Sequence, residues 1–267
     1  RGAAGIPPAV LYALDLCGAD RVLTLGGVQG VAALAFGLFG GRPADILVGP
    51  GNQFVAEAKR LLYGRVAIDM FAGPTESLVI ADKAADAEIV AADLIGQAEH
   101  GWNSPVWLIA LDRALAERVI AIAPTLIAAL PEPNRQSAGD ARRDFAEVVV
   151  ADTPEEAAQL SDSYASEHTH VQCGDLDWWH RRLRNYGSLF IGTNASVVYA
   201  DKCSGTNHTL PTMGAGRYTG GLWVGSYLKI CTHQWIDDDG IAVVARPAMR
   251  QSMNEGMVAD RDRKSVV

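Results

Sequence analysis

The chain has 267 residues, of which 49% are hydrophobic and 20% charged, a balance typical of a folded globular protein rather than a disordered one. Its formal net charge is −8 at pH 7 and its basic clusters are short, so we expect no nucleic-acid partner. Widely spaced Cys17, Cys173, Cys203 and Cys231, and apolar runs too short to span a bilayer, predict a cytoplasmic protein with no membrane partner.

The first 150 residues alternate short apolar runs with longer helical patterns. The strand-like runs are 22–25, 46–48, 66–68, 78–80, 106–109 and 148–150. The helical patterns are 7–16, 29–38, 53–63, 87–98 and 113–129. Strands that alternate with helices are typical of βαβ units, so we predict an α/β fold with a mostly parallel sheet.

The second half of the chain begins with another helix signal, because Thr153 precedes Pro-Glu-Glu and has the side chain of an N-cap. A strand is expected near 189–191. From Gly192 to Gly221 the periodicity disappears, and a loop of this length is usually functional. The runs 222–229 and 247–263 predict helices of a small tail domain.

Two glycine-rich turns each lie between a strand-like run and a helical pattern. They are Gly26–Gly30 and Gly49–Phe54. Glycine lets backbone N–H groups approach an anion at a helix N-terminus, where ligands of open α/β sheets bind. Neither turn has the GxGxxG spacing of dinucleotide-binding loops. A purely structural role as a tight turn therefore explains each glycine-rich segment as well as anion binding does.

Two further motifs combine polar side chains with turn or helix positions. The segment Ala72–Glu76 offers the hydroxyl of Thr75 and the carboxylate of Glu76 to a substrate, although a turn alone would explain its Gly-Pro pair. Gln97 and His100 are three residues apart and share one helix face, which indicates a metal-ligand pair or, alternatively, a capping histidine.

Acid–base chemistry is indicated by Ser166-Glu-His-Thr-His170. A carboxylate beside an imidazole can move protons near neutral pH, which points to Glu167 and His168. His168 and His170 would face one side of a strand, so a second metal pair is the alternative. Further along, Asp201 is a hard oxygen donor, and the nearby pair Asn207-His208 binds a ligand or braces the loop.

Taken in order, five segments of the chain resemble the successive signatures of the histidinol dehydrogenase family. They are Val48–Lys59, Ile68–Glu76, Asp93–Gly101, Ser166–His168 and Ser204–Thr212. The resemblance covers nearly the whole chain and is specific, because chance would not reproduce five motifs in order. It implies incomplete Rossmann-like parallel-sheet domains with a small helical C-terminal tail.

The resemblance also divides the chain into three parts. It implies a partial NAD-binding Rossmann-like domain over residues 1–75 and a second partial domain with the metal and catalytic residues over 76–221. The helical tail then covers residues 222–267. The family's usual N-terminal segment has no counterpart before Arg1, so we expect this chain to be the C-terminal two-thirds of a longer enzyme.

Members of the family oxidise a primary alcohol to a carboxylate in two hydride transfers to NAD, through a bound aldehyde, and they use zinc. The resemblance therefore implies NAD and Zn2+ as cofactors and L-histidinol as the default substrate. It also implies a homodimer in which the tail reaches the partner subunit's site.

Site residues follow from the same resemblance, motif by motif. The residues that match zinc ligands are Gln97, His100 and Asp201, and those that match the acid–base pair are Glu167 and His168. The residues that match substrate contacts are Thr75, His208 and Glu255, and those that match cofactor contacts are Gln29 and Asn52.

The chain departs from the family pattern at two places. Asp260 stands where the fourth zinc ligand is a histidine; an aspartate oxygen can bind zinc, and the alternative is that the metal is lost. The stretch Gly214–Gly225 resembles paralogues of the family such as sulfopropanediol 3-dehydrogenase. This resemblance suggests an anionic diol as the substrate, with Arg217 binding its anionic group. The alternative is that Arg217 only braces its loop. A catalytically silent, truncated paralogue is the remaining alternative.

Overall fold

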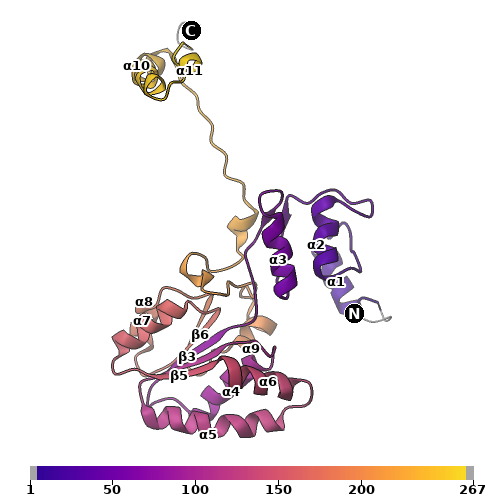
Figure 1. Cartoon of the computed structure of the whole chain (residues 1–267), viewed down its shortest axis with the longest axis vertical. Coiled ribbons are helices and arrows are strands. Elements are labelled where there is room, and N and C mark those ends of the chain that lie inside the picture. Colours follow the sequence, from indigo (N-terminus) through magenta and orange to yellow (C-terminus); the bar gives the residue numbers. More distant parts are fainter. Residues whose placement is uncertain (1–4, 263–267) are drawn as a thin grey trace. The chain divides into compact units, whose positions relative to one another are not determined.

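The computed structural model describes residues 5–262 of the chain. The chain forms two compact units, the first ending at Ser226 and the second beginning at Tyr227 (Figure 1). Two sheets lie in the first unit, one of two strands and one of five, and every strand pair is parallel. The predicted α/β fold with parallel sheets is therefore confirmed.

The smaller sheet pairs β1 (Ile46–Leu47) with β2 (Ala67–Ile68). Its helices are α1 (Pro8–Leu16), α2 (Gly27–Phe36) and α3 (Gln53–Leu62). The core cluster here is small, and its buried members are Ala35, Leu47 and Val66. The chain passes through α3 between the two strands, which makes this part a short βαβ unit.

The larger sheet has the strand order β5-β4-β3-β6-β7. Its strands are β3 (Ser77–Ala81), β4 (Val106–Ala110), β5 (Ala146–Val150), β6 (His168–Gln172) and β7 (Ser188–Ile191). The helices that connect them are α4 (Ala87–Ala98), α5 (Arg113–Ala129), α6 (Asn134–Phe145), α7 (Pro154–Tyr164) and α8 (Leu176–Arg182). The predicted N-cap is confirmed, since Thr153 Oγ1 accepts from Glu156 N at 3.1 Å.

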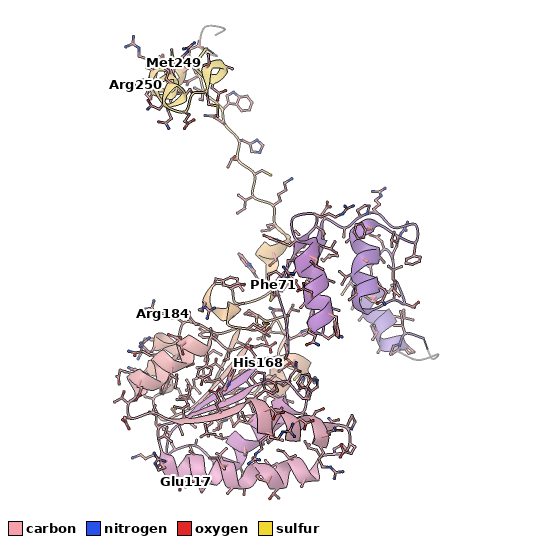
Figure 2. The ribbon with its side chains drawn as sticks, viewed as in Figure 1. Phe71, Glu117, His168, Arg184, Met249 and Arg250 are labelled. Atoms are coloured by element: carbon pink, nitrogen blue, oxygen red, sulfur yellow. The ribbon has the colours of Figure 1, made fainter. Side chains whose placement is uncertain are left out.

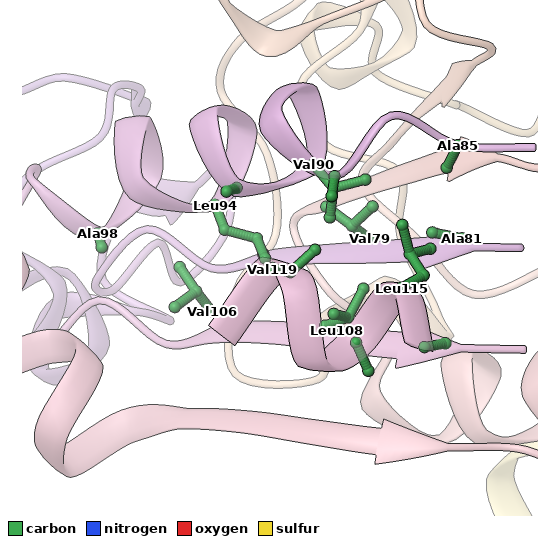
Figure 3. Close-up of a cluster of buried hydrophobic side chains, with 14 of the residues drawn as sticks. Val79, Ala81, Ala85, Val90, Leu94, Ala98, Val106, Leu108, Leu115 and Val119 are labelled. Carbon is green, nitrogen blue, oxygen red and sulfur yellow. The ribbon is translucent and has the colours of Figure 1, made fainter. Parts of the chain in front are cut away.

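Helices cover both faces of this sheet because its strands are apolar on both sides. Val79 of β3 and Leu108 of β4 pack against α4 and α5, as Figure 3 shows, and α6 contributes to the same cluster. The neighbouring residues Leu78 and Ile109 point to the opposite face and belong to a second core cluster with α7 and α8. Because side chains alternate along a strand, each apolar run feeds both cores.

After β7 the chain lacks long helices until the second unit. Short turns occur at α9 (Val197–Tyr199), the π-helical turn η1 (Ala200–Ser204), and the 3-10 turns η2 (Ala215–Arg217) and η3 (Val224–Tyr227). Residues 228–236 form no helix or strand, and every one of them is exposed. The second unit contains α10 (Asp238–Asn254) and α11 (Val258–Asp262).

Three sequence-based predictions were wrong. Residues 22–25 form no strand, and both Val22 and Leu25 are exposed, so this apolar run has no neighbouring strand to complete a ladder. The helix expected over 222–229 is only the single turn η3, in a stretch that contains Gly221 and Gly225.

The last predicted helix has a different start and an interruption. It begins at Asp238 rather than at Pro247, because Asp237 caps it by accepting from Gly240 N at 2.8 Å. Pro247 lies inside α10, and the helix ends at Asn254 before α11 begins. The predicted end at residue 263 lies outside the described residues.

The predicted division after residues 75 and 221 stays a prediction; the two compact units divide after Ser226. All four cysteines are free thiols. Within residues 5–262, no helix is both long and apolar enough to cross a membrane.

Candidate active site

The acid–base residues predicted from the sequence, Glu167 and His168, lie at the amino end of β6, beside the amino end of the neighbouring strand β3. Glu76 directly precedes β3, His168 begins β6, and Ser77 pairs with His168 in the sheet register. Ligands of open α/β sheets bind at carboxyl ends of strands, so this edge differs from the general rule. The reason is connectivity: the chain leaves the carboxyl end of β2 and runs directly into the amino end of β3.

His168 is fixed by the backbone of Glu76. The His168 N–H donates to the Glu76 carbonyl at 3.2 Å, and the ring atom Nδ1 lies 3.1 Å from the same oxygen. A carbonyl oxygen only accepts, so Nδ1 carries the hydrogen in this contact. The other ring nitrogen, Nε2, is therefore left as the atom that can accept a proton.

Burial keeps this imidazole neutral at pH 7; Figure 2 shows the position of His168 at the large sheet. Burial lowers the pKa of His168 to about 4, an effect opposed by the charge of Asp201 and strengthened by His100. Asp201 and His100, which the resemblance assigns to the metal, therefore lie close enough to influence this ring. The neutral form has the free lone pair that a general base requires.

Glu167 holds its proton at neutral pH for a related reason. Burial raises the pKa of its carboxyl to about 8, and the nearby charges of Glu76 and Asp201 add to the effect. Its Oε2 accepts from the Glu76 N–H at 3.1 Å. Burial likewise raises the pKa of Glu76 to about 7, so two adjacent carboxyl groups titrate in the neutral range.

Glu76 is a residue whose role the sequence analysis left open between substrate contact and turn. Its Oε1 accepts from the Met213 N–H at 2.7 Å, which directs the carboxylate to the loop after β7. The Gly73 N–H donates to Thr212 Oγ1 at 2.7 Å in the same region. The segments 72–76 and 204–213, separated in sequence, are thus joined by two hydrogen bonds.

A cavity of about 390 Å3 brings together Asn52, Thr75 and His100. It is lined by the glycine-rich turn after β1, by the Gly-Pro-Thr turn before β3 and by residues 100–104 after α4. The cavity is therefore lined by one candidate cofactor contact, one candidate substrate contact and one candidate metal ligand. The side chain of Asn52 also caps α3, accepting from Phe54 N at 3.1 Å and Val55 N at 3.2 Å.

The turn that carries Asn52 is braced by a buried ion pair, Lys59–Asp69, whose side chains are 4% and 0% exposed. Lys59 Nζ donates to the Gly49 carbonyl at 3.0 Å, and the Gly49 N–H donates to Asp69 Oδ2 at 2.8 Å. Both backbone groups of Gly49 are thus fixed, a feature the sequence analysis missed.

The fit of a metal ion to this site rests mainly on Gln97. Its Oε1 is buried and has no hydrogen-bond partner among the described residues. A buried amide oxygen without a partner is costly unless a ligand satisfies it. Together with His100 and Asp201 it offers three donors, which fit zinc in number.

The donor set also has a limit. The part of the chain that the structure describes has no group of three or more His, Cys, Asp or Glu side chains that could hold a metal ion. Asp260 belongs to α11 of the second unit and is exposed.

Nine of the twelve candidates do not line this cavity, among them the acid–base pair and four residues with other predicted roles. Gln29 is exposed in α2, His208 is exposed in the loop after β7, and Arg217 is exposed in η2. Glu255 caps the end of α10 in the second unit, where its Oε1 accepts from Gln251 Nε2 at 2.7 Å. Their predicted roles stay predictions.

The sequence also suggests His170 as part of a second metal pair and Asn207 as a residue that braces its loop. His170 is buried on the same face of β6 as His168, with its ring centroid 4.7 Å from that of Phe190. Asn207 braces its own loop, accepting from Thr209 N at 2.8 Å and donating to the Thr209 carbonyl at 3.0 Å.

Comparison with known proteins agrees with the resemblance in the motifs. The family model of histidinol dehydrogenase matches residues 2–266. A histidinol dehydrogenase homolog of Pelagibacter ubique is 58% identical over 255 residues, 96% of this chain and 60% of that protein. The sulfopropanediol 3-dehydrogenase of Ruegeria pomeroyi is 58% identical over 257 residues, 96% of this chain and 59% of that protein.

More distant members also match nearly the whole chain. The histidinol dehydrogenase of Thermus thermophilus is 38% identical over 254 residues, 94% of this chain and 60% of that protein. The crystal structure of histidinol dehydrogenase from Elizabethkingia anophelis superposes with a TM-score of 0.87 at 35% identity, covering 97% of this chain and 59% of that one. The chain spans about 60% of the length of the relatives it matches, and it belongs to the histidinol dehydrogenase family.

Proposed function

We propose that this chain carries the acid–base part of an NAD-dependent and zinc-dependent dehydrogenase that oxidises a primary alcohol to a carboxylate in two hydride transfers. The observation that carries the proposal is His168: Nδ1 is held by the Glu76 carbonyl, and the ring is neutral beside protonated Glu167. The family membership of the chain supports the reaction class.

The first proton transfer belongs to His168. Its Nε2 accepts the proton of the alcohol, and the hydrogen bond from Nδ1–H to the Glu76 carbonyl stabilises the imidazolium that results. When bound, zinc supplies a positive charge beside the alcohol oxygen and NAD supplies the hydride acceptor. The residues that would hold zinc are Gln97, His100, Asp201 and, from the second unit, Asp260.

The second half of the reaction assigns a different role to Glu167. In its ionised form, which predominates above about pH 8, its carboxylate can take a proton from the water that hydrates the aldehyde. A carboxyl with a pKa of about 8 binds that proton more strongly than an ordinary glutamate and is therefore the better base. A second hydride transfer then gives the carboxylate product.

Binding of substrate and cofactor is proposed for residues around this pair. Thr75, His208 and Glu255 would contact the substrate, whereas Gln29 and Asn52 would contact NAD. Because Asn52 Oδ1 already caps α3, its Nδ2 is the atom left to donate to a ligand. We further propose a homodimeric, cytoplasmic enzyme, as the resemblance implies.

The test measures zinc content and NADH formation from L-histidinol and other alcohols, before and after a chelator. We expect close to one zinc per chain and activity that the chelator abolishes. His168→Ala should lower kcat by at least about 100-fold, the usual contribution of a general base. His180→Ala, on the exposed face of α8, is the matched control. Absence of turnover with every alcohol would instead favour a catalytically silent paralogue.

An anionic diol is a second candidate substrate. It is favoured by the identity of 58% to sulfopropanediol 3-dehydrogenase, compared with 38% to the Thermus histidinol dehydrogenase. Arg217 is exposed and has donors suited to a sulfonate. Arg217→Ala should therefore raise KM about tenfold or more for a sulfonated diol and leave KM for neutral alcohols unchanged, since one charge-assisted contact is lost. Equal effects on both substrates would refute this alternative.

A further inference from the structure

A polar bridge on α4 connects the elements that carry the candidate site. Asp93 precedes Gln97 by four residues and His100 by seven, so the three side chains share one face of the helix and the turn that follows it. The Asp93 side chain is 15% exposed, and its carboxylate accepts two hydrogen bonds from other elements.

The first hydrogen bond comes from β6. Gln172 Nε2 donates to Asp93 Oδ2 at 2.8 Å. Gln172 is four residues after His168 in the same strand, so both side chains lie on the face of the sheet that packs against α4. This bond therefore fixes α4 relative to the strand that holds the general base.

The second hydrogen bond comes from the loop after β7. Ser196 Oγ donates to Asp93 Oδ1 at 3.1 Å. Ser196 is the residue before α9, and α9 continues without a break into η1, which contains Asp201. This bond fixes α4 relative to the segment that carries the third metal candidate.

The surroundings of Asp93 make these two bonds its main anchors. His170 Nδ1 lies 3.5 Å from Asp93 Oδ2, too far for a strong hydrogen bond, and the imidazole shields that side of the carboxylate from water. Hydrogen bonds to an ionised carboxylate are stronger and shorter than neutral ones, so one side chain can hold two elements.

We propose that Asp93 is a positioning residue that sets the mutual geometry of Gln97, His100 and Asp201. Through Gln172 it ties that set to the strand of His168, and through Ser196 it ties down the segment of Asp201. The expected effect of Asp93 on zinc affinity rests on the function proposed above. The two hydrogen bonds that form the bridge do not depend on that function.

The variants Asp93→Ala and Asp93→Asn separate the bridge from the negative charge. Alanine removes both acceptors. Asparagine retains them in altered form: its Oδ1 accepts from Ser196, and its Nδ2 donates to Gln172 Oε1, a buried atom without a partner among the described residues, once the Gln172 amide flips. Asp86→Ala is the matched control, because Asp86 caps the start of the same helix by accepting from Glu88 N at 2.8 Å.

Two measurements on the full chain test the proposal. Hydrogen exchange of residues 196–204 in metal-free protein reports the bridge, and chelator competition reports zinc affinity. We expect Asp93→Ala to speed exchange in this segment and to weaken zinc binding about 10- to 100-fold, as for other outer-shell partners of metal ligands. Asp93→Asn should restore both measurements nearly to the original values, and Asp86→Ala should leave zinc affinity unchanged.

The outcomes separate this inference from the proposed function. If the rate of hydrogen exchange over residues 196–204 rises in Asp93→Ala and the original protein binds no zinc, the bridge is supported and the proposed zinc-dependent function is refuted. Exchange and zinc affinity that both stay unchanged refute the bridge. If Asp93→Ala fails to fold, Ser196→Ala removes one bond and keeps the carboxylate; unchanged exchange over 196–204 in that variant overturns the proposal equally.

Discussion

Two histidines of β6 are kept uncharged by the protein around them. Burial lowers the pKa of His168 to about 4 and that of His170 to about 3, whereas both titrate near their ordinary value in the unfolded chain. Between pH 6.5 and 4 these two residues therefore bind more protons in the unfolded chain than in the folded one, so their contribution to the free energy of unfolding falls as pH decreases through this range. Glu76 and Glu167, whose pKa values burial raises, bind more protons in the folded chain above about pH 4.5 and contribute in the opposite direction.

This argument gives a prediction for acid stability. His170→Gln removes one of the two histidine contributions, so the difference in free energy of unfolding between the variant and the original protein should shift in favour of the variant by on the order of 1 kcal/mol per pH unit as pH falls below 6.5. Urea unfolding between pH 7 and 4.5 measures this difference, even if the variant is less stable overall. His180→Gln, at an exposed position, should leave the slope as it is. An identical slope in His170→Gln would contradict the prediction.

At the scale of elements, stability is concentrated where the large sheet meets α4, α5 and α6 (Figure 3). Leu108 of β4 is 1% exposed in this cluster. Leu108→Ala should lower the free energy of unfolding by about 2–5 kcal/mol, because it removes packing and leaves a cavity. Leu61→Ala on α3, where Leu61 is 70% exposed, is the control and should change it by less than about 0.5 kcal/mol. A loss below about 1 kcal/mol in Leu108→Ala would show that the cluster can collapse around the gap.

Elements with a strong apolar period were predictable from the sequence. The helices 87–98 and 113–129 were predicted with the bounds that the structure has, because each has a regular apolar face and an aspartate cap. α6 was not predicted: it is mostly polar, and only Ala138 and Ala141 are buried. The run 22–25 is apolar without being a strand, because strand formation also requires a partner that a local pattern cannot reveal.

The candidate site was predictable in its residues and less so in its geometry. Motifs indicated Glu167 and His168, and the structure places both beside Glu76. The sequence could not reveal that the site lies at the amino edge of the large sheet, since that depends on the path from β2 into β3. Asp93 was overlooked because an aspartate on a helix is usually a solvated residue.

At the scale of the whole molecule, both large core clusters lie within the first unit. A chain that ends at Ser226 should therefore keep the unfolding midpoint of the first unit in urea. A lower midpoint in the shortened chain would contradict this expectation.

The exposed segment 228–236 gives the molecule an optical property. Trp235 is 99% exposed and Ile230 is 94% exposed. An indole ring in water emits at longer wavelength than one packed against protein, as Trp179 is in its buried position. The difference spectrum between the protein and Trp235→Phe therefore isolates this one fluorophore. A shift of that spectrum to shorter wavelength would report, in real time and without a label, the moment at which any surface covers the segment.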